Sequence, residues 1–464
     1  MQARIKFILE RWLHWSHQSV NHQIFSATLS IGLFTLLGKL VAILKELLTA
    51  YQFGTGDKLD AFIIAFLLPA FVINILSGSL RASLIPVLVR IRTQNKIKER
   101  REFLSGILFL SLLVLIASVI ILALAAPLII QWFAAGFSDE KLLLSRNLLF
   151  LLLPVLIFST LSAIWGAILN TEEHFVVVAI APALIHLGAI SLLLLAGKQW
   201  GIYALASGTI TGFIAEFLLL SFAVKRIGLA VFPHWQGLTA PIRNVIQQFM
   251  PMAAGMVLMS STIIVDQGMA AMLDPGSVSS LNYASRIIGL LTGVGAMALG
   301  TAVLPHFSRQ VASQDWSGIL HTFRTYSRLI LALTIPFCGI LIYFSAPLIE
   351  LLFQRGAFDA GDTQLVAHVQ IFYLLQLPFY IIGIMGAQLL SALSCNQILM
   401  KISALNLLIN IAGNLILMKY IGLAGIALST SIVYFVSLFF IAGYIQHFIQ
   451  HKINQQPTTG STCN

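Results

Sequence analysis

The chain has 464 residues, of which 58% are hydrophobic and only 9% are charged, and its formal net charge is +10. Soluble domains carry about 25% charged residues, so this composition excludes a soluble protein and indicates a polytopic membrane protein. Three scattered cysteines, Cys338, Cys395 and Cys463, fit neither a disulfide framework nor a metal site. Anionic membrane lipid explains the positive charge, and no nucleic-acid partner is needed to account for it.

The segment 1–23 mixes basic residues and tryptophans with apolar residues, which is typical of an amphipathic helix on a membrane surface. Apolar windows of about 20 residues then predict twelve membrane-spanning helices. The first six cover 24–51, 60–88, 104–126, 147–169, 176–197 and 202–224. The second six cover 245–273, 281–305, 327–349, 366–392, 400–418 and 422–446. Two short segments, 128–137 and 348–353, are predicted as interfacial helices.

Basic residues and an internal repeat organise these helices. With the N-terminus inside, seventeen lysines and arginines fall in inner segments and six in outer segments, so both termini are predicted to be cytoplasmic. In 54–90 and again in 276–309, a turn and a span precede a proline that stands four residues before an arginine, as Pro86–Arg90 and Pro305–Arg309. A parallel repeat predicts a transporter that rocks around a central site.

The predicted fold is all-α. Two six-helix lobes, 24–224 and 245–447, are joined by a cytoplasmic linker at 225–244 and followed by a polar cytoplasmic tail at 448–464.

Charged residues within the predicted spans are candidates for lining a cavity: Lys39, Lys45, Glu46, Asp60, Arg81, Glu216 and Arg286. A charge at bilayer depth costs roughly 2.5–3.5 kcal/mol even on the gentlest insertion scales, so such residues usually face a polar space. The alternative for Lys45 and Arg81 is snorkelling to the interface, and for Asp60 it is a helix N-cap. Basic side chains from both lobes suit an anionic substrate, above all phosphate or pyrophosphate.

A second polar group carries a single negative charge and consists of Asp266, Asn410, Asn414, Thr430 and the carbonyl of Ile426. These oxygens are ligands for a hard cation, and the single charge suits a monovalent ion. The alternative is that the two asparagines only hydrogen-bond between helices. No catalytic grouping or nucleotide-binding motif is evident. We therefore expect no enzyme activity, no cofactor beyond a coupling ion, and transport driven by an ion gradient, the membrane potential or the substrate gradient.

Five stretches resemble the MurJ/MviN family of lipid II flippases: GTGDKLDAF (54–62), LIPVL (84–88), NYASR (282–286), ALGTAVLP (298–305) and LFQRGAFDAGDT (352–363). They occur in the family's order over nearly the whole chain. The resemblance implies the fold of the multidrug/oligosaccharidyl-lipid/polysaccharide exporter superfamily, with two lobes in a V around a central cavity. It also implies that Lys39, Lys45, Asp60 and Arg286 occupy charged cavity positions. The group around Asp266 then coincides with the sodium site of some members, with Asn414 in place of an aspartate.

The chain departs from the family's pattern at several positions. Val72 and Ser77 replace a charged pair on the second span, Lys39 and Lys45 replace arginines, and LSALSCNQ (390–397) replaces the pattern after the tenth span. Twelve spans rather than fourteen imply that the extra lipid-tail groove is absent.

The resemblance implies a flippase for a polyprenyl-pyrophosphate-linked sugar, above all lipid II for peptidoglycan synthesis, in the bacterial cytoplasmic membrane. Membrane lipids and cell-envelope synthesis proteins are the expected partners. The alternatives are a flippase for a lipid-linked exopolysaccharide or O-antigen unit, a cation-coupled drug exporter and a non-transporting scaffold.

Overall fold

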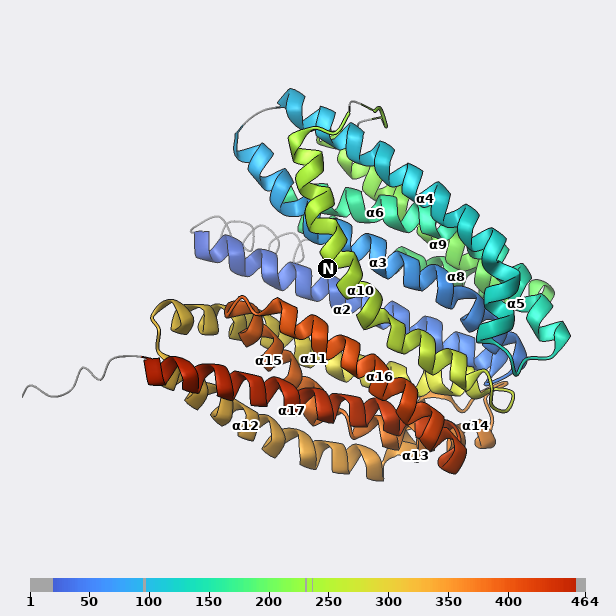
Figure 1. The fold of residues 1–464 in the computed structure, drawn as a ribbon. Coiled ribbons are helices and arrows are strands. Elements are labelled where there is room, and N and C mark those ends of the chain that lie inside the picture. Colours follow the sequence, from blue (N-terminus) through green and yellow to red (C-terminus); the bar gives the residue numbers. More distant parts are fainter. Residues whose placement is uncertain (1–19, 95–96, 230–231, 236, 456–464) are drawn as a thin grey trace, which may run out of the picture. The chain divides into compact units, whose positions relative to one another are not determined.

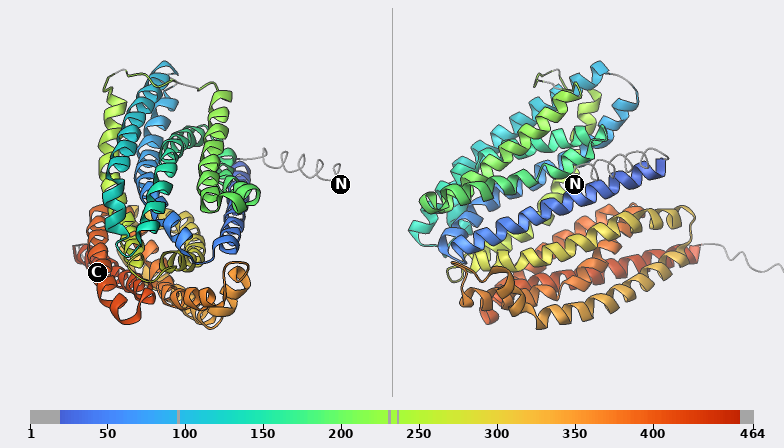
Figure 2. Two further views of the ribbon diagram at one scale, coloured as in Figure 1. Left: turned by 90° about the vertical axis from the view of Figure 1, so that its right-hand side faces the viewer. Right: turned by 180° about the vertical axis from the view of Figure 1, so that it is seen from behind.

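The computed structural model describes residues 20–94, 97–229, 232–235 and 237–455, in which every regular element is a helix (Figure 1). The first eight are α2 (Val20–Phe53), α3 (Asp57–Thr93), α4 (Ile97–Phe133), α5 (Asp139–Leu152), α6 (Pro154–Thr171), α7 (Phe175–Ile180), α8 (Ala183–Trp200) and α9 (Ile202–Arg226). The others are α10 (Ala240–Ala270), α11 (Ser277–Ala312), α12 (Trp316–Tyr343), α13 (Ser345–Phe353), α14 (Ala360–Leu374), α15 (Leu377–Ala392), α16 (Asn396–Ile421) and α17 (Leu423–Gln455). Figure 2 shows the same helices from two other sides. Most of the predicted surface helix 1–23 lies outside the described residues, as does the tail after residue 455.

The predicted spans lie on these helices, but three of them are interrupted. The span 147–169 is divided between α5 and α6, the span 176–197 between α7 and α8, and the span 366–392 bends by 42° between α14 and α15. A proline stands at each break, at or just before the first turn of the following helix: Pro154, Pro182 and Pro378. Proline cannot continue the preceding helix but is well suited to beginning one.

Two predictions about short segments need correction. The segment 128–137 is not a separate helix, because α4 continues through it to Phe133. The end of the ninth span was predicted too late, at residue 349, because α12 already stops at Tyr343. The short helix α13 begins at Ser345 and contains the predicted segment 348–353.

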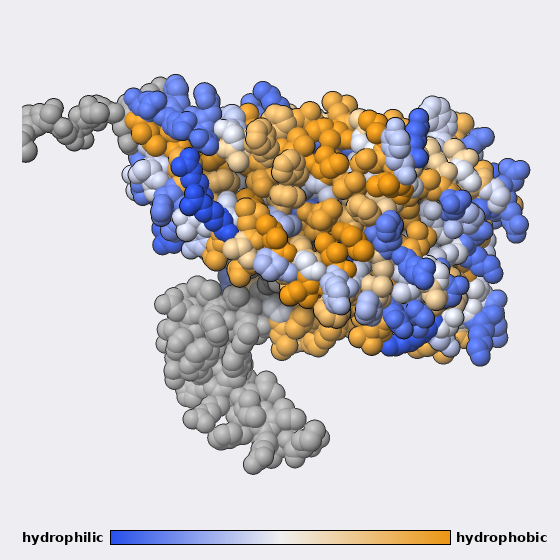
Figure 3. Space-filling view, turned by 90° about the horizontal axis from the view of Figure 1, so that it is seen from below, coloured by the Kyte–Doolittle hydropathy of each residue, from blue (hydrophilic) through white to orange (hydrophobic). Residues whose placement is uncertain are grey.

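Among the described residues, nine helical segments are long and apolar enough to cross a membrane, and the bent pair α14–α15 makes ten. The helices α2 and α11 are not among them, so the full count of twelve stays a prediction. Large apolar side chains remain exposed, including Leu124 on α4 and Leu333 on α12. On the face drawn in Figure 3, hydrophobic residues cover the middle and hydrophilic residues gather towards the two ends. This distribution identifies an integral membrane protein, in which lipid covers the apolar surface.

The chain divides into two compact units. Unit 1 comprises 1–52, 65–129 and 143–256, and unit 2 comprises 53–64, 130–142 and 257–464. The core of unit 1 includes Leu104 and Ile168, whereas that of unit 2 includes Phe307 and Leu389. The two units thus have separate hydrophobic cores.

The boundary between the units falls within α10, after Met256, and the predicted linker 225–244 belongs to unit 1. There the linker packs on α4: Ser105 Oγ donates to the carbonyl of Phe232 at 2.5 Å, and the rings of Phe109 and Trp235 lie 5.7 Å apart. The division into two lobes at 24–224 and 245–447, which the sequence predicts, therefore stays a prediction.

The internal repeat has a structural counterpart. Gly201 separates α8 from α9 with φ 55° and ψ −128°, and Gly422 separates α16 from α17 with φ 59° and ψ −136°. Only glycine adopts this backbone region readily. Pro86 and Pro305 each stand two turns before the end of their helices, α3 and α11. The same local features therefore recur in the two halves of the chain.

Candidate functional site

Lys39 and Lys45 both lie on α2, but their surroundings differ. Lys39 is exposed. Lys45 is largely buried, and its Nζ pairs with Oε1 of the neighbouring Glu46 at 2.8 Å. The Glu46 carboxylate offsets the charge of Lys45, whereas Lys39 presents its ammonium on an exposed face of the helix.

Arg81 and Glu216 are opposite charges within electrostatic range of each other in unit 1. Arg81 is exposed on α3, and Glu216 is buried on α9, close enough for the guanidinium to act electrostatically on the carboxylate. A buried carboxylate in a membrane protein is costly unless an opposite charge lies nearby. The sequence placed Glu216 among the candidates for lining a cavity, and the structure places it within electrostatic range of Arg81.

Asp60 has a different environment from the one predicted, because it caps a helix distant in sequence. Its Oδ2 accepts from the main-chain N–H of Gly276 at 2.8 Å, and its Oδ1 accepts from that of Ser279 at 2.8 Å. Lys141 Nζ donates to Asp60 Oδ2 at 2.9 Å and to Asp57 Oδ1 at 2.6 Å. The N-cap alternative therefore holds for Asp60, but the capped helix is α11 rather than its own. With only 1% of its surface exposed and both oxygens engaged, Asp60 is disfavoured as a substrate ligand.

Three of the stretches that carried the family resemblance meet around this cap in unit 2. Asp362 on α14 accepts hydrogen bonds from the N–H and the hydroxyl of Thr55. Tyr283 on α11 packs against Phe353 and Phe358, with ring centroids 5.2 and 5.6 Å away. Gly276 has φ 88° and fits against Thr55, where a Cβ atom would collide with the Thr55 carbonyl. These stretches build a structural junction, which explains why so many of their residues are small, aromatic or capping.

Arg286 is exposed on α11, and its Nε donates to Asn282 Oδ1 one turn earlier at 3.2 Å. It belongs to unit 2 together with Asp60, whereas Lys39, Lys45 and Arg81 belong to unit 1. The convergence of the basic residues on one ligand stays a prediction.

The five residues of the predicted cation group do lie together, inside unit 2. Asp266 on α10 accepts from Asn410 Nδ2 at 2.9 Å, from Asn414 Nδ2 at 2.7 Å and from Thr430 Oγ1 at 3.1 Å. The Thr430 hydroxyl also lies 3.1 Å from the carbonyl oxygen of Ile426. Asp266 is 7% exposed and both asparagines are almost fully buried. Three helices thus converge on one carboxylate.

Two oxygens of this group bear on whether it fits an ion. Asn410 Oδ1 and Asn414 Oδ1 are buried and have no hydrogen-bond partner among the described residues. The oxygen and nitrogen of an amide have nearly the same shape, so a half-turn of each amide would point both oxygens at Asp266. The group then offers the all-oxygen set that a monovalent cation requires, and the residues fit the ion that the resemblance implies.

Sequence reasoning missed two tyrosines beside this group. Tyr373 on α14 is in hydrogen-bond contact with Thr430, and Tyr434 on α17 lies near the Asp266 carboxylate. Neither carries a sequence signal of its own, because aromatic residues are common in every span. Only the packing of α14 and α17 brings them to Asp266.

Comparison with known proteins decides the family. The family described as "Lipid II flippase MurJ" matches residues 49–457. The chain belongs to the lipid II flippase MurJ family. Among its relatives is the "Probable lipid II flippase MurJ" of Buchnera aphidicola subsp. Baizongia pistaciae, which is 28% identical over 424 residues, 90% of this chain and 82% of the relative. The "Lipid II flippase MurJ" of Burkholderia cenocepacia is 26% identical over 430 residues, 88% and 81% of the two chains.

Solved structures support the same assignment. A lipid II flippase MurJ in an inward closed conformation matches with a TM-score of 0.77 and 27% identity, over 94% of this chain and 93% of that one. An inward-facing multidrug resistance MATE family transporter of the MOP superfamily also gives a TM-score of 0.77, at 14% identity, over 90% and 96%. At that identity the second match establishes the fold alone. The MurJ family and the wider superfamily fold implied by the sequence are both confirmed.

Proposed function

We propose that this MurJ family member is a flippase that moves lipid II, a polyprenyl-pyrophosphate-linked sugar, across the cytoplasmic membrane. The observation that carries the proposal is the family match over residues 49–457, supported by similarity to proteins named as lipid II flippases. The substrate is then translocated without a chemical step, so the protein acts as a transporter and not as an enzyme.

We assign the substrate's pyrophosphate to Lys39, Lys45, Arg81 and Arg286. The proposal is supported by the cost of placing charges within membrane spans without a polar ligand, which applies most directly to Lys39, since Lys45 and Arg81 each have a carboxylate nearby. Exposure of Lys39, Arg81 and Arg286 on their own units is consistent with this role. Lysines bind phosphate as point charges, without the bidentate geometry of arginine, so this site is expected to grip pyrophosphate less tightly than an arginine site.

Complementation of a strain depleted of its own lipid II flippase tests the function. We expect the wild-type chain to restore growth and cell shape, and Lys39→Ala and Arg286→Ala to fail although both insert and accumulate normally. Lys225→Ala, which removes an exposed cation at the end of α9, is the control and should complement. Full rescue by both alanine variants would reject the site. Failure of the wild type, with normal membrane accumulation, would point to a lipid-linked exopolysaccharide unit as the substrate instead.

We further propose that sodium is a coupling ion, held by Asp266, Asn410, Asn414, Thr430 and the carbonyl of Ile426. When bound, the ion supplies a positive charge that offsets the buried Asp266 carboxylate. Support comes from the buried side-chain oxygens of the two asparagines, which have no hydrogen-bond partner in the part of the chain that the structure describes. We expect sodium, but not choline, to raise the melting temperature of the purified protein, and Asp266→Asn to remove that difference. A wild-type melting temperature that is the same in both salts would reject the proposal.

The proposed orientation places both termini in the cytoplasm, as the distribution of basic residues indicates. This orientation can be tested with two single-cysteine variants, Arg92→Cys and Lys58→Cys. Each is treated in intact cells with a membrane-impermeant thiol reagent. Only the cysteine at position 58 should react, and the reverse pattern would invert the orientation.

A further inference from the structure

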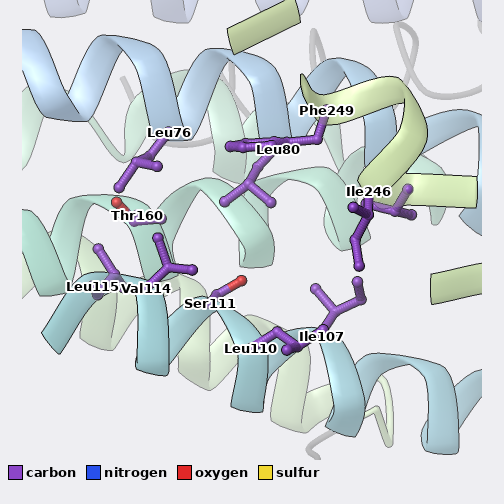
Figure 4. A pocket seen from close by; sticks show the side chains of 11 residues that line it. Leu76, Leu80, Ile107, Leu110, Ser111, Val114, Leu115, Thr160, Ile246 and Phe249 are labelled. Atoms are coloured by element: carbon purple, nitrogen blue, oxygen red, sulfur yellow. The ribbon is translucent and has the colours of Figure 1, made fainter. Parts of the chain in front are cut away.

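Two cavities lie between the same helices of unit 1, and the function proposed above uses neither. The first is an apolar cavity of about 100 Å³ between α3, α4, α6 and α10 (Figure 4). Leu80, Ile107 and Phe249 are among its lining residues. The second is a polar cavity of about 480 Å³ between the end of α3 and the starts of α4 and α10.

The two cavities adjoin along α10 and follow one face of α3. Asn244 and Gln248 line the polar cavity, and the next residues in the chain, Val245 and Phe249, line the apolar one. On α3, Leu80 and Arg90 are ten residues apart, which corresponds to about 15 Å along the helix. That length is about half the hydrocarbon thickness of a bilayer. The cavities therefore follow one another in the order and spacing of a lipid head group and acyl chain.

The polar cavity presents one group of each charge. Arg90 comes from the last turn of α3 and Glu99 from the first turn of α4, and amide side chains of Gln94, Asn244 and Gln248 lie between. A phosphate suits Arg90, and a primary ammonium suits Glu99 and the amide oxygens, because it has three N–H donors. Phosphoethanolamine carries both groups, whereas phosphoglycerol lacks the cation and pyrophosphate adds a second anion.

The lining of the apolar cavity is hydrocarbon except for two hydroxyls, and one of these belongs to Thr160, which is only 1% exposed. Figure 4 shows that hydroxyl and the hydroxyl of Ser111 among aliphatic side chains at the cavity wall. Val114, at the same wall, is 43% exposed, so the cavity is not sealed from the membrane. A single hydrocarbon chain can enter there from the surrounding lipid.

We propose that unit 1 binds one phosphatidylethanolamine molecule, with its head group between Arg90 and Glu99 and a short segment of one acyl chain in the cavity beside Leu80 and Phe249. The lipid fills the space between α10 and the α3–α4 pair. It therefore holds the first half of α10 against unit 1.

Photo-cross-linking tests the proposal with the full-length protein in phosphatidylcholine vesicles. The probe is phosphatidylethanolamine with a diazirine in one acyl chain, and phosphatidylglycerol with the same chain is its comparison. We expect the ethanolamine probe to label the peptides around 107–115 and 245–249 several-fold more than the glycerol probe. Equal labelling by the two probes would overturn the proposal in favour of ordinary boundary lipid.

Variants separate the head group from the chain. Glu99→Gln should reduce labelling to the level of the glycerol probe, while the control Glu102→Gln, three residues later and paired with Lys98, should leave it unchanged. Ser111→Phe should remove labelling of both peptides but not of other membrane-facing segments. Val114→Trp, at an exposed position, provides the same test if Ser111→Phe does not fold. Unchanged labelling in Glu99→Gln, or displacement of the probe by undecaprenyl pyrophosphate but not by unlabelled phosphatidylethanolamine, would overturn the assignment.

Discussion

The carboxylate of Asp60 accepts a hydrogen bond from the main-chain N–H of Ser279, 219 residues later in the chain. Gly276, the N-cap residue of α11, has no side chain to satisfy the first N–H groups of that helix. A carboxylate at a helix N-terminus satisfies those donors and also interacts favourably with the helix dipole. One residue at the start of α3 thereby stabilises the start of α11.

Replacing Asp60 is expected to destabilise the protein more than replacing its neighbour Asp57. Asp60→Ala leaves two main-chain N–H groups of α11 without a cap and weakens the pairing of Lys141, which is 7% exposed. Breaking a buried charge pair costs about 3–5 kcal/mol. The Asp57 side chain is 58% exposed, so Asp57→Ala should cost about 1 kcal/mol or less. Thermal unfolding of the purified variants in detergent measures both effects, and equal melting temperatures would contradict the capping role.

Restoring the second carboxylate of the cation group should increase sodium dependence. In Asn414→Asp a second negative charge lies beside Asp266, where the amide nitrogen now stands 2.7 Å from its Oδ1. Without a cation the two carboxylates repel each other, so we expect a lower melting temperature in choline chloride. Sodium should raise it by more than in the wild type, because a ligand that binds only the folded state stabilises it by RT ln(1 + [L]/Kd), which is larger for a tighter site.

Asn406→Asp is the matched control for that experiment. Asn406 lies one turn before Asn410 on α16, and its Nδ2 donates to Ser437 instead of Asp266. The control should show the sodium response of the wild type. An identical sodium response in Asn414→Asp and Asn406→Asp would argue against an ion at Asp266.

The sequence was most informative where a pattern lies within one helix and least informative where distant helices meet. Asn410 and Asn414, four residues apart, predicted a shared face on α16, and the structure places both on Asp266. Asp60 was open to an N-cap interpretation, but no local pattern could identify α11 as the capped helix. Tyr373 was missed for the same reason, since its contact with Thr430 depends on how α14 packs against α17. The breaks within spans were overlooked because hydropathy windows average across a proline.

The close approach of α8 and α9 predicts strong intolerance to side chains at Gly188. A Cβ atom there would lie 2.6 Å from the carbonyl oxygen of Gly208 and from the Cα of Gly212. Gly188→Ala must push the two backbones apart, and overpacking typically costs about 1–3 kcal/mol. Gly255→Ala on α10 meets no atom of the described residues within 4 Å, so it should be neutral or stabilise by up to about 1 kcal/mol through helix propensity. Urea or thermal unfolding distinguishes the two, and tolerance of Gly188→Ala would show that α8 and α9 are less closely packed.

Arg81 and Glu216 should behave as a coupled pair. Arg81→Ala removes the positive charge that acts on the buried Glu216 carboxylate, so we expect a lower melting temperature and less protein in the membrane. Adding Glu216→Gln should recover most of that loss, because a neutral amide needs no counter-charge. The double-mutant cycle is read from thermal unfolding, with Arg226→Ala, an exposed arginine at the end of α9, as the control. Additive effects of the two substitutions would mean that the charges are independent. Arg81 would then contribute to substrate binding alone.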